Sequence, residues 1–254
     1  MSFFGDVVEW FGDNWSGDGG ILDRSIEHLE ISFLSVAIAL VIALPPAIVL
    51  GHLRRGGNAA INVANIGRAL PSFAILVLAY QFTDRLGVVP TVVALVALAI
   101  PPVFTNTYIG LREVDAELRE AATGMGMSGT QALRRIELPI AVPLIMAGIR
   151  TSTVQVIATA TLATLIGWGG LGFYPIVGLR TQNNVMVFGG ALVVIALAML
   201  VDGALALLQR LLVSRGLATK KAPRWAVETD IAAEVVEPDV DVDVEVDAKE
   251  RAAA

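Results

Sequence analysis

Three ionisable residues lie inside long apolar stretches of this 254-residue sequence, namely Arg68, Arg150 and Asp202. A charge within a bilayer is costly unless it is paired or faces water, so such residues often line a polar path. One interpretation is that they line a pore or act as its gate, with Asp202 paired to one of the arginines. The other is that they lie near helix ends, where arginine extends to the membrane surface and Asp202 pairs locally. Both interpretations stay open for Arg150, whereas for Arg68 and Asp202 we favour the position near a helix end.

Residues that carry catalysis or bind metals are sparse. The sequence contains no cysteine, and its two histidines, His28 and His52, are too far apart to form a metal site by themselves. The run from Gly124 to Gly129 satisfies the G-x-G-x-x-G pattern, but no strand precedes it, and Thr130 stands where a phosphate-binding loop needs lysine. We therefore expect this chain to be no enzyme, to bind no metal or cofactor, and to hydrolyse no ATP by itself.

The composition places the chain in a lipid bilayer. Hydrophobic residues make up 55% of it and charged residues 17%, whereas a soluble domain has about 25% charged residues. A chain of this length cannot bury the excess in its own core. No basic stripe indicates nucleic-acid binding. We expect an all-α membrane protein with about five transmembrane helices, each near the length that crosses a bilayer, over residues 31–50, 58–81, 88–109, 139–165 and 185–208.

The positions of Lys and Arg predict how these spans are oriented. Thirteen of the 18 follow the first span, separate the third and fourth, or follow the fifth, and three lie on the opposite side. Because cytoplasmic loops carry the excess of positive charge, we expect an outside N-terminus and a cytoplasmic C-terminus in a multi-pass protein of the cytoplasmic (inner) membrane. Residues 1–30 form a predicted extracytoplasmic or interfacial lead-in, with a docking surface as the alternative. Residues 213–254 form a predicted cytoplasmic, acidic and disordered tail.

A polar segment, residues 112–137, lies between the third and fourth spans on the predicted cytoplasmic side. Apolar residues recur at helical spacing in its first part, glycines interrupt it, and a short helical run resumes at Thr130 before Leu138-Pro139 stops it. A helix, a glycine turn and a second helix form a compact protrusion that fits a groove in another protein.

Within this segment, Glu120-Ala121-Ala122 is followed by Gly126 and, after nine further residues, by Ile136-x-Leu138-Pro139. This pattern resembles the "EAA" signature of permease subunits of ABC importers. The surrounding runs are similar to the osmoprotectant branch of these permeases, which takes glycine betaine, carnitine or choline. They include Asn106-Thr107-Tyr108, Ala147-Gly-Ile-Arg-Thr151 and Gly169-Gly-Leu-Gly172. The resemblance covers roughly residues 10–212, with departures at Gly167-Trp168-Gly169 and Phe173-Tyr174-Pro175.

The resemblance implies that the signature is a coupling helix that docks into a cleft of a separate ATPase. The small alanines allow close approach, Gly126 allows a turn with positive φ, and Glu120 has the charge to pair with a basic residue. The implied coupling residues are Glu120, Ala121, Ala122, Gly126, Ile136, Leu138 and Pro139. The implied partners are ABC ATPase subunits that bind the ATP, a second permease copy or a sibling permease, and an extracytoplasmic substrate-binding protein.

The function expected from this resemblance is a permease domain, residues 31–212, in an ATP-driven importer of a small compatible solute. The first alternative is an ABC permease for another small solute such as methionine. The second is a stand-alone secondary transporter or channel, which five spans without evident duplication do not favour.

Overall fold

The computed structural model describes residues 3–69 and 71–212, without the side chains of several α3 residues, Arg68 among them. Every regular element in these ranges is helical, which confirms the all-α prediction. The predicted acidic tail lies outside the described residues. The elements, in chain order, are α1 Phe3–Asn14, α2 Ile21–His52, α3 Gly57–Ala69, α4 Ser72–Thr83, α5 Val88–Arg112, α6 Ala116–Gly124, α7 Gly129–Ala132, the π-helix η1 Leu133–Glu137, α8 Leu138–Ala160, the 3-10 helix η2 Thr161–Ile166, α9 Phe173–Arg180 and α10 Asn184–Leu212.

Four helical runs among the described residues are long and apolar enough to cross a membrane: Ile21–His52, Val88–Arg112, Gly129–Ile166 and Asn184–Leu212. They contain the first, third, fourth and fifth predicted spans. The first run begins ten residues before the predicted span, because apolar length marks only the bilayer-crossing part of a helix and not a polar extension of it. The predicted boundary between lead-in and first span therefore falls inside α2.

The second predicted span, residues 58–81, is two helices and not one. α3 ends at Ala69, and Pro71 is the extended N-cap of α4, with φ −63° and ψ 126°. Proline lacks the amide donor and disfavours helical backbone in the residue before it, so the helix breaks there. α4 has 12 residues, fewer than the roughly 20 that cross a bilayer. The number of crossings and their orientation stay predictions.

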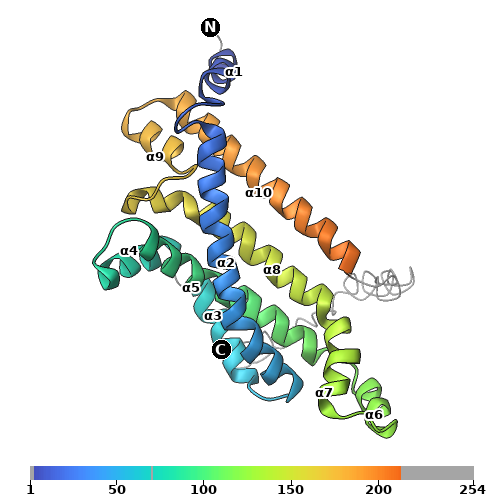
Figure 1. Cartoon of the computed structure of the whole chain (residues 1–254). Coiled ribbons are helices and arrows are strands. Elements are labelled where there is room, and N and C mark those ends of the chain that lie inside the picture. Colours follow the sequence, from blue (N-terminus) through green and yellow to red (C-terminus); the bar gives the residue numbers. More distant parts are fainter. Residues whose placement is uncertain (1–2, 70, 213–254) are drawn as a thin grey trace, which may run out of the picture. The chain divides into compact units, whose positions relative to one another are not determined.

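The core forms where α5 packs against both α2 and α8 (Figure 1). Small residues allow these helices to approach closely. A Cβ on Gly148 of α8 would lie 2.8 Å from Asn106 Cβ and 2.9 Å from the Pro102 carbonyl oxygen of α5. Likewise, a Cβ on Gly51 of α2 would lie 2.8 Å from Leu111 Cβ. This three-helix core fixes the ends of α2, α5 and α8 relative to one another.

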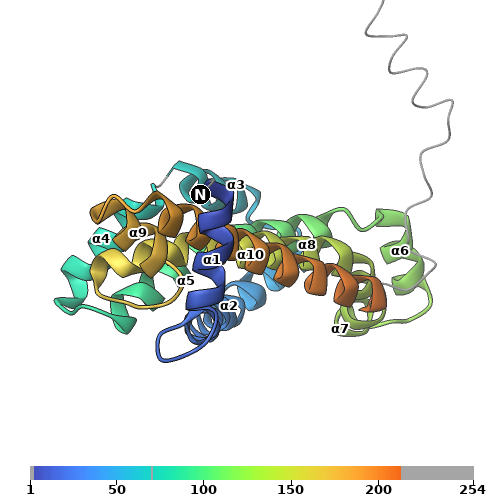
Figure 2. The same cartoon turned by 90° about the horizontal axis from the view of Figure 1, so that it is seen from above.

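The helix α10 packs along α8, α9 and α1 (Figure 2). Its outer surface carries many large exposed hydrophobic residues, among them Ile195, Met199, Leu200, Leu207 and Leu211. Such a continuous apolar surface is stable in lipid or against another chain, and not in water.

An aromatic cluster joins α1 to α9, at one of the two places where the chain departs from the family pattern. The rings of Trp10 and Tyr174 meet edge to face at 5.1 Å, and the Arg24 guanidinium lies 3.6 Å from the Phe173 ring centre. The Tyr174 hydroxyl donates to the Gly19 carbonyl oxygen at 3.2 Å. Burial raises the pKa of the Tyr174 phenol, which keeps this donor protonated. Part of the aromatic lead-in therefore packs against protein.

Candidate functional site

The predicted coupling segment folds into a helix, a glycine turn and a second helix, which we call the knob (residues 116–132). Asp115 caps the first helix of the knob, because its carboxylate accepts a hydrogen bond from the Glu117 amide at 3.0 Å. In both views α6 and α7 project beyond the ends of α5 and α8 (Figures 1 and 2). The fold of this segment thus agrees with the protrusion expected from its spacing.

Gly126 ends α6 in the left-handed conformation, with φ +78°. Its amide donates to the Thr123 carbonyl oxygen at 2.9 Å, and the Met127 amide donates to that of Ala122 at 3.0 Å. This pair of bonds is a Schellman motif, which satisfies the last carbonyl groups of a helix and requires positive φ at its turn residue. The predicted conformation of Gly126 is confirmed.

The second half of the knob continues into the membrane-spanning helix without a stop. Ser128 and Gln131 form a reciprocal capping box at the start of α7. The chain then passes through the π-helix Leu133–Glu137 into α8, and Pro139 lies in the first turn of α8. Pro139 has no amide to donate, and it follows directly on a π-helix, where the regular i→i−4 bonding of an α-helix is already interrupted. The predicted stop at Leu138-Pro139 is therefore wrong.

The seven signature residues divide by exposure. Glu120, Ala121, Gly126 and Pro139 are exposed, Ile136 and Leu138 are half-buried, and Ala122 is fully buried. A Cβ on Gly126 would meet no atom within 4 Å. One side of the knob thus faces the rest of the chain through Ala122, while Glu120, Ala121 and Gly126 lie on a surface open to a partner.

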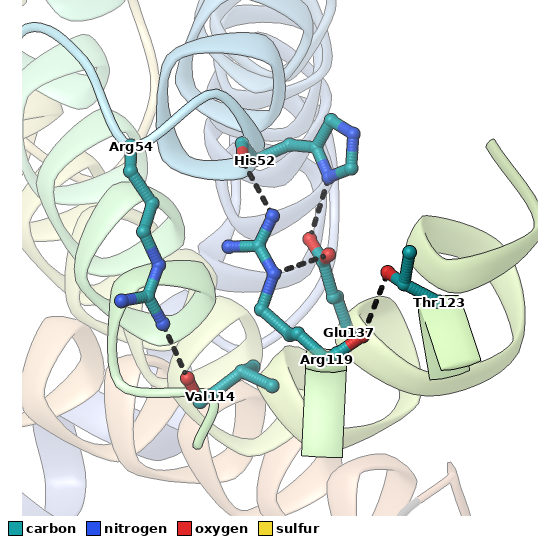
Figure 3. Close-up of polar contacts among 6 residues, drawn as sticks. All are labelled: His52, Arg54, Val114, Arg119, Thr123 and Glu137. Carbon is teal, nitrogen blue, oxygen red and sulfur yellow. Dashed lines mark hydrogen bonds and ion pairs between the residues drawn. The ribbon is translucent and has the colours of Figure 1, made fainter. Parts of the chain in front are cut away.

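A buried carboxylate holds the knob against the membrane-spanning helices. Glu137 is fully buried, and its Oε2 accepts a hydrogen bond from His52 Nδ1 at 2.8 Å (Figure 3). Its Oε1 forms an ion pair with Arg119 Nε at 3.0 Å. Arg119 Nη2 also donates to the His52 carbonyl oxygen at 2.9 Å. These three residues, which we call the Glu137 cluster, join the end of α2, the knob helix α6 and the start of α8.

Two further arginines form hydrogen bonds that stabilise the loop leading into the knob. Arg54 Nη2 donates to the carbonyl oxygen of the buried Val114 at 2.9 Å (Figure 3). Arg112 Nη1 donates in turn to the Arg54 carbonyl oxygen at 2.8 Å. The sequence reasoning missed these contacts and the Glu137 cluster. Glu137 lies between the apolar Ile136 and Leu138, which indicates a buried carboxylate. The sequence does not indicate which residues it contacts.

Arg150 and Asp202, predicted as pore or gate candidates, form a two-bond ion pair. Arg150 Nε donates to Asp202 Oδ1 at 2.9 Å, and Nη2 donates to Oδ2 at 2.8 Å. Arg150 Nη1 also donates to Gln209 Oε1 at 3.2 Å. The suggested pairing of Asp202 with an arginine is confirmed for Arg150. The third candidate, Arg68, lies in α3, and its side chain is outside the described part of the chain.

Across residues 3–69 and 71–212, no group of three or more His, Cys, Asp or Glu residues is placed to hold a metal ion. The site therefore offers two kinds of chemistry. The knob presents a surface for another protein, and the Arg150–Asp202 pair presents opposite charges within a membrane-spanning region.

Comparison with known proteins provides independent information on this fold. Residues 31–214 match the family described as "Binding-protein-dependent transport system inner membrane component". The chain is 41% identical over 201 residues to the glycine betaine/carnitine/choline transport system permease protein OpuCB of Bacillus subtilis, covering 78% of this chain and 91% of that protein. It is 38% identical over 203 residues to the carnitine transport permease protein OpuCB of Listeria monocytogenes, covering 80% and 91%.

A more distant relative and a solved structure agree with this match. The osmoprotectant import permease protein OsmW of Salmonella typhimurium is 31% identical over 216 residues, covering 84% of this chain and 99% of that protein. An inward-facing structure of the MetNI methionine ABC transporter superposes with a TM-score of 0.66 at 23% identity, covering 76% of this chain and 97% of that one. At this identity the likeness shows the fold alone.

Proposed function

The chain belongs to the family of binding-protein-dependent transport system inner membrane components, and on this premise we propose that it is a permease subunit of an ATP-driven importer. Its solute is a small compatible solute such as glycine betaine, carnitine or choline, the solutes in the names of relatives up to 41% identical to it. The chain is a multi-pass membrane protein, and its place is the cytoplasmic membrane.

The observation that carries this proposal is the arrangement of the knob. Glu120, Ala121 and Gly126 are exposed on it, and they match the coupling signature in type and spacing. A partner ATPase that contacts this surface pushes on α6, and the Glu137 cluster passes the displacement to α2 and α8. A passive connector needs neither an exposed signature nor a buried carboxylate that anchors it.

The proposed assembly contains separate ATPase subunits, a second permease chain and an extracytoplasmic substrate-binding protein. ATP is bound and hydrolysed by the ATPase subunits, and this chain provides the path and the docking surface. Likeness to the methionine transporter concerns the fold, so it does not favour methionine over the compatible solutes.

Reconstitution tests the proposal directly. The chain is placed in proteoliposomes with a candidate ABC ATPase and a candidate substrate-binding protein, and uptake of labelled glycine betaine, carnitine, choline and methionine is measured together with ATP hydrolysis. We expect at least one of the first three solutes to accumulate and to stimulate hydrolysis. Accumulation in liposomes that lack the ATPase would instead identify a stand-alone transporter, and stimulation by methionine alone would assign a different solute.

A further inference from the structure

The Arg150–Asp202 pair opens onto a groove along one face of α8. The groove has a volume of about 640 Å³ and is lined by residues of α8 that recur every three or four positions from Ala147 to Ala158, together with Asp202 of α10. Its polar lining comprises the ion pair, Thr151 and Gln155, and the rest is aliphatic. This volume lies within the range of roughly 300–1,000 Å³ that is usual for small-molecule sites.

The charges of the pair are not enclosed by the rest of this chain. The side chains of Arg150 and Asp202 are 31% and 39% exposed, respectively, although both lie within apolar helices. Contact between charged groups and hydrocarbon costs several kcal/mol, so charged residues inside membrane proteins face other protein or a water-filled space. This face of α8 therefore meets protein or water and not lipid, and we infer a water-filled space because the groove is open beside the pair.

The geometry of the pair matches the two ends of a zwitterion. We propose that Arg150 and Asp202 bind a zwitterionic solute, with the solute carboxylate on the guanidinium of Arg150 and its quaternary ammonium beside Asp202. The closed pair shows that the guanidinium already holds one carboxylate through two parallel bonds, an arrangement that a second carboxylate reproduces. This inference rests on the proposed function, because it identifies where the imported solute binds.

Gln209 keeps the Arg150 guanidinium oriented when Asp202 separates from it. Gln209 accepts from Arg150 Nη1 at 3.2 Å, and Gln209 Nε2 donates to the Pro143 carbonyl oxygen at 3.3 Å. Gln209 thereby connects Arg150 to its own helix through α10. A quaternary ammonium has no N–H to donate, so its methyl groups require only aliphatic contact and a nearby negative charge, which Ala147, Val154 and Asp202 supply.

The proposed site should bind glycine betaine and choline through different residues. Glycine betaine has a carboxylate and a quaternary ammonium, whereas choline has the ammonium without a carboxylate. Arg150 therefore contributes to binding of glycine betaine and not of choline, while Asp202 contributes to binding of both. A hydrogen-bonded contact between charged groups is worth about 1.5–3 kcal/mol, which corresponds to about tenfold or more in affinity.

The test measures uptake of the two solutes by the reconstituted transporter, always with the same substrate-binding protein at saturation. Any change in selectivity then comes from this chain. We expect Arg150→Gln to raise the ratio of choline to glycine betaine uptake about tenfold or more. The matched control is Arg210→Gln, which removes an exposed arginine of α10 outside the groove and should leave the ratio at the parent value. A parent-like ratio in Arg150→Gln overturns the proposal.

A second variant covers the case in which Arg150→Gln fails to assemble because Asp202 is left unpaired. The double variant Arg150→Met with Asp202→Leu removes both charges, a replacement that membrane and soluble cores tolerate better than a lone charge. We expect it to lose uptake of both solutes about tenfold or more. Parent-like uptake of both would show that the pair only packs the helices. If the parent transporter imports none of glycine betaine, carnitine and choline, the proposed function fails; if it imports glycine betaine and choline and only the variants disagree, the binding site alone is refuted.

Discussion

Replacing Glu137 by glutamine should release the knob from the membrane-spanning helices without unfolding them. The side chain is fully buried and contacts two cationic or potentially cationic groups, His52 and Arg119. Glutamine keeps one acceptor oxygen for Arg119 and turns an NH₂ donor toward His52 Nδ1, so the negative charge that faces Arg119 is lost and the contact with His52 is kept only in the tautomer whose Nδ1 accepts.

The magnitude follows from the burial of the three side chains. Removing one partner of a fully buried ion pair costs about 3–5 kcal/mol, and losing a hydrogen bond to a charged group costs about 1.5–3 kcal/mol. The side chains of His52 and Arg119 are 20% and 22% exposed, so water relieves part of the loss. We expect about 2–3 kcal/mol for undocking of α6, which is a change of about 30- to 160-fold in the undocking equilibrium.

Hydrogen exchange of the amides in residues 116–128 measures this equilibrium on the isolated chain in detergent or nanodiscs. We expect their exchange to accelerate by that factor in Glu137→Gln, while amides in the centre of α5 stay at parent rates. Glu120→Gln is the control, because Glu120 is exposed on the same helix and its replacement changes the surface without the anchor. Equal exchange in the two variants would refute the role of the Glu137 cluster in holding the knob.

Two further predictions test particular glycines. Gly126→Val should abolish ATP-driven uptake while membrane insertion, followed by fractionation, stays intact: φ is +78°, and a β-branched residue there costs about 1–2 kcal/mol or more. Gly126→Asn, which tolerates this conformation, should retain uptake, and equal uptake by both variants would contradict the reasoning. Gly148→Ala should lower thermal stability in detergent by about 1–3 kcal/mol, because the new Cβ would meet Asn106 and the Pro102 carbonyl oxygen within 2.9 Å. Its control is Gly203→Ala on α10, where a Cβ meets nothing within 4 Å, and a stability loss of the same size there would count against close packing as the cause.

The elements that the sequence predicts well are those encoded in local patterns. Apolar length identifies the four long helical runs, and the spacing of the glycines identifies the turn at Gly126. The prediction of one span over residues 58–81 fails at Pro71, because an average of hydropathy over a span does not register where one residue stops the helix. The predicted stop at Leu138-Pro139 is wrong because the local sequence marks proline as a helix breaker and does not reveal the π-helix that precedes it in a continuing helical run.

Contacts between distant residues lie beyond what local patterns encode. His52 and Glu137 are 85 positions apart, and their contact exists only because α2 and α8 both pack on α5. The sequence showed an isolated histidine and an acid inside a signature, with no rule that pairs them. The Arg150–Asp202 pair was easier to anticipate, because charges in apolar helices are few and each needs a partner.

The two charged sites are connected by a single helical element. Gly129–Ile166 is one continuous helical run, with Glu137 at the end of its π-helix and Arg150 further along, about 20 Å away at the helical rise. A close-packed helix transmits displacement along its axis better than a loop does. In the proposed function, displacement of the knob moves the base of α8 and, along this helix, Arg150, whose partners Asp202 and Gln209 belong to a different helix. In the proposed function, this arrangement connects docking of the ATPase on the knob with opening of the pair that we propose binds the solute.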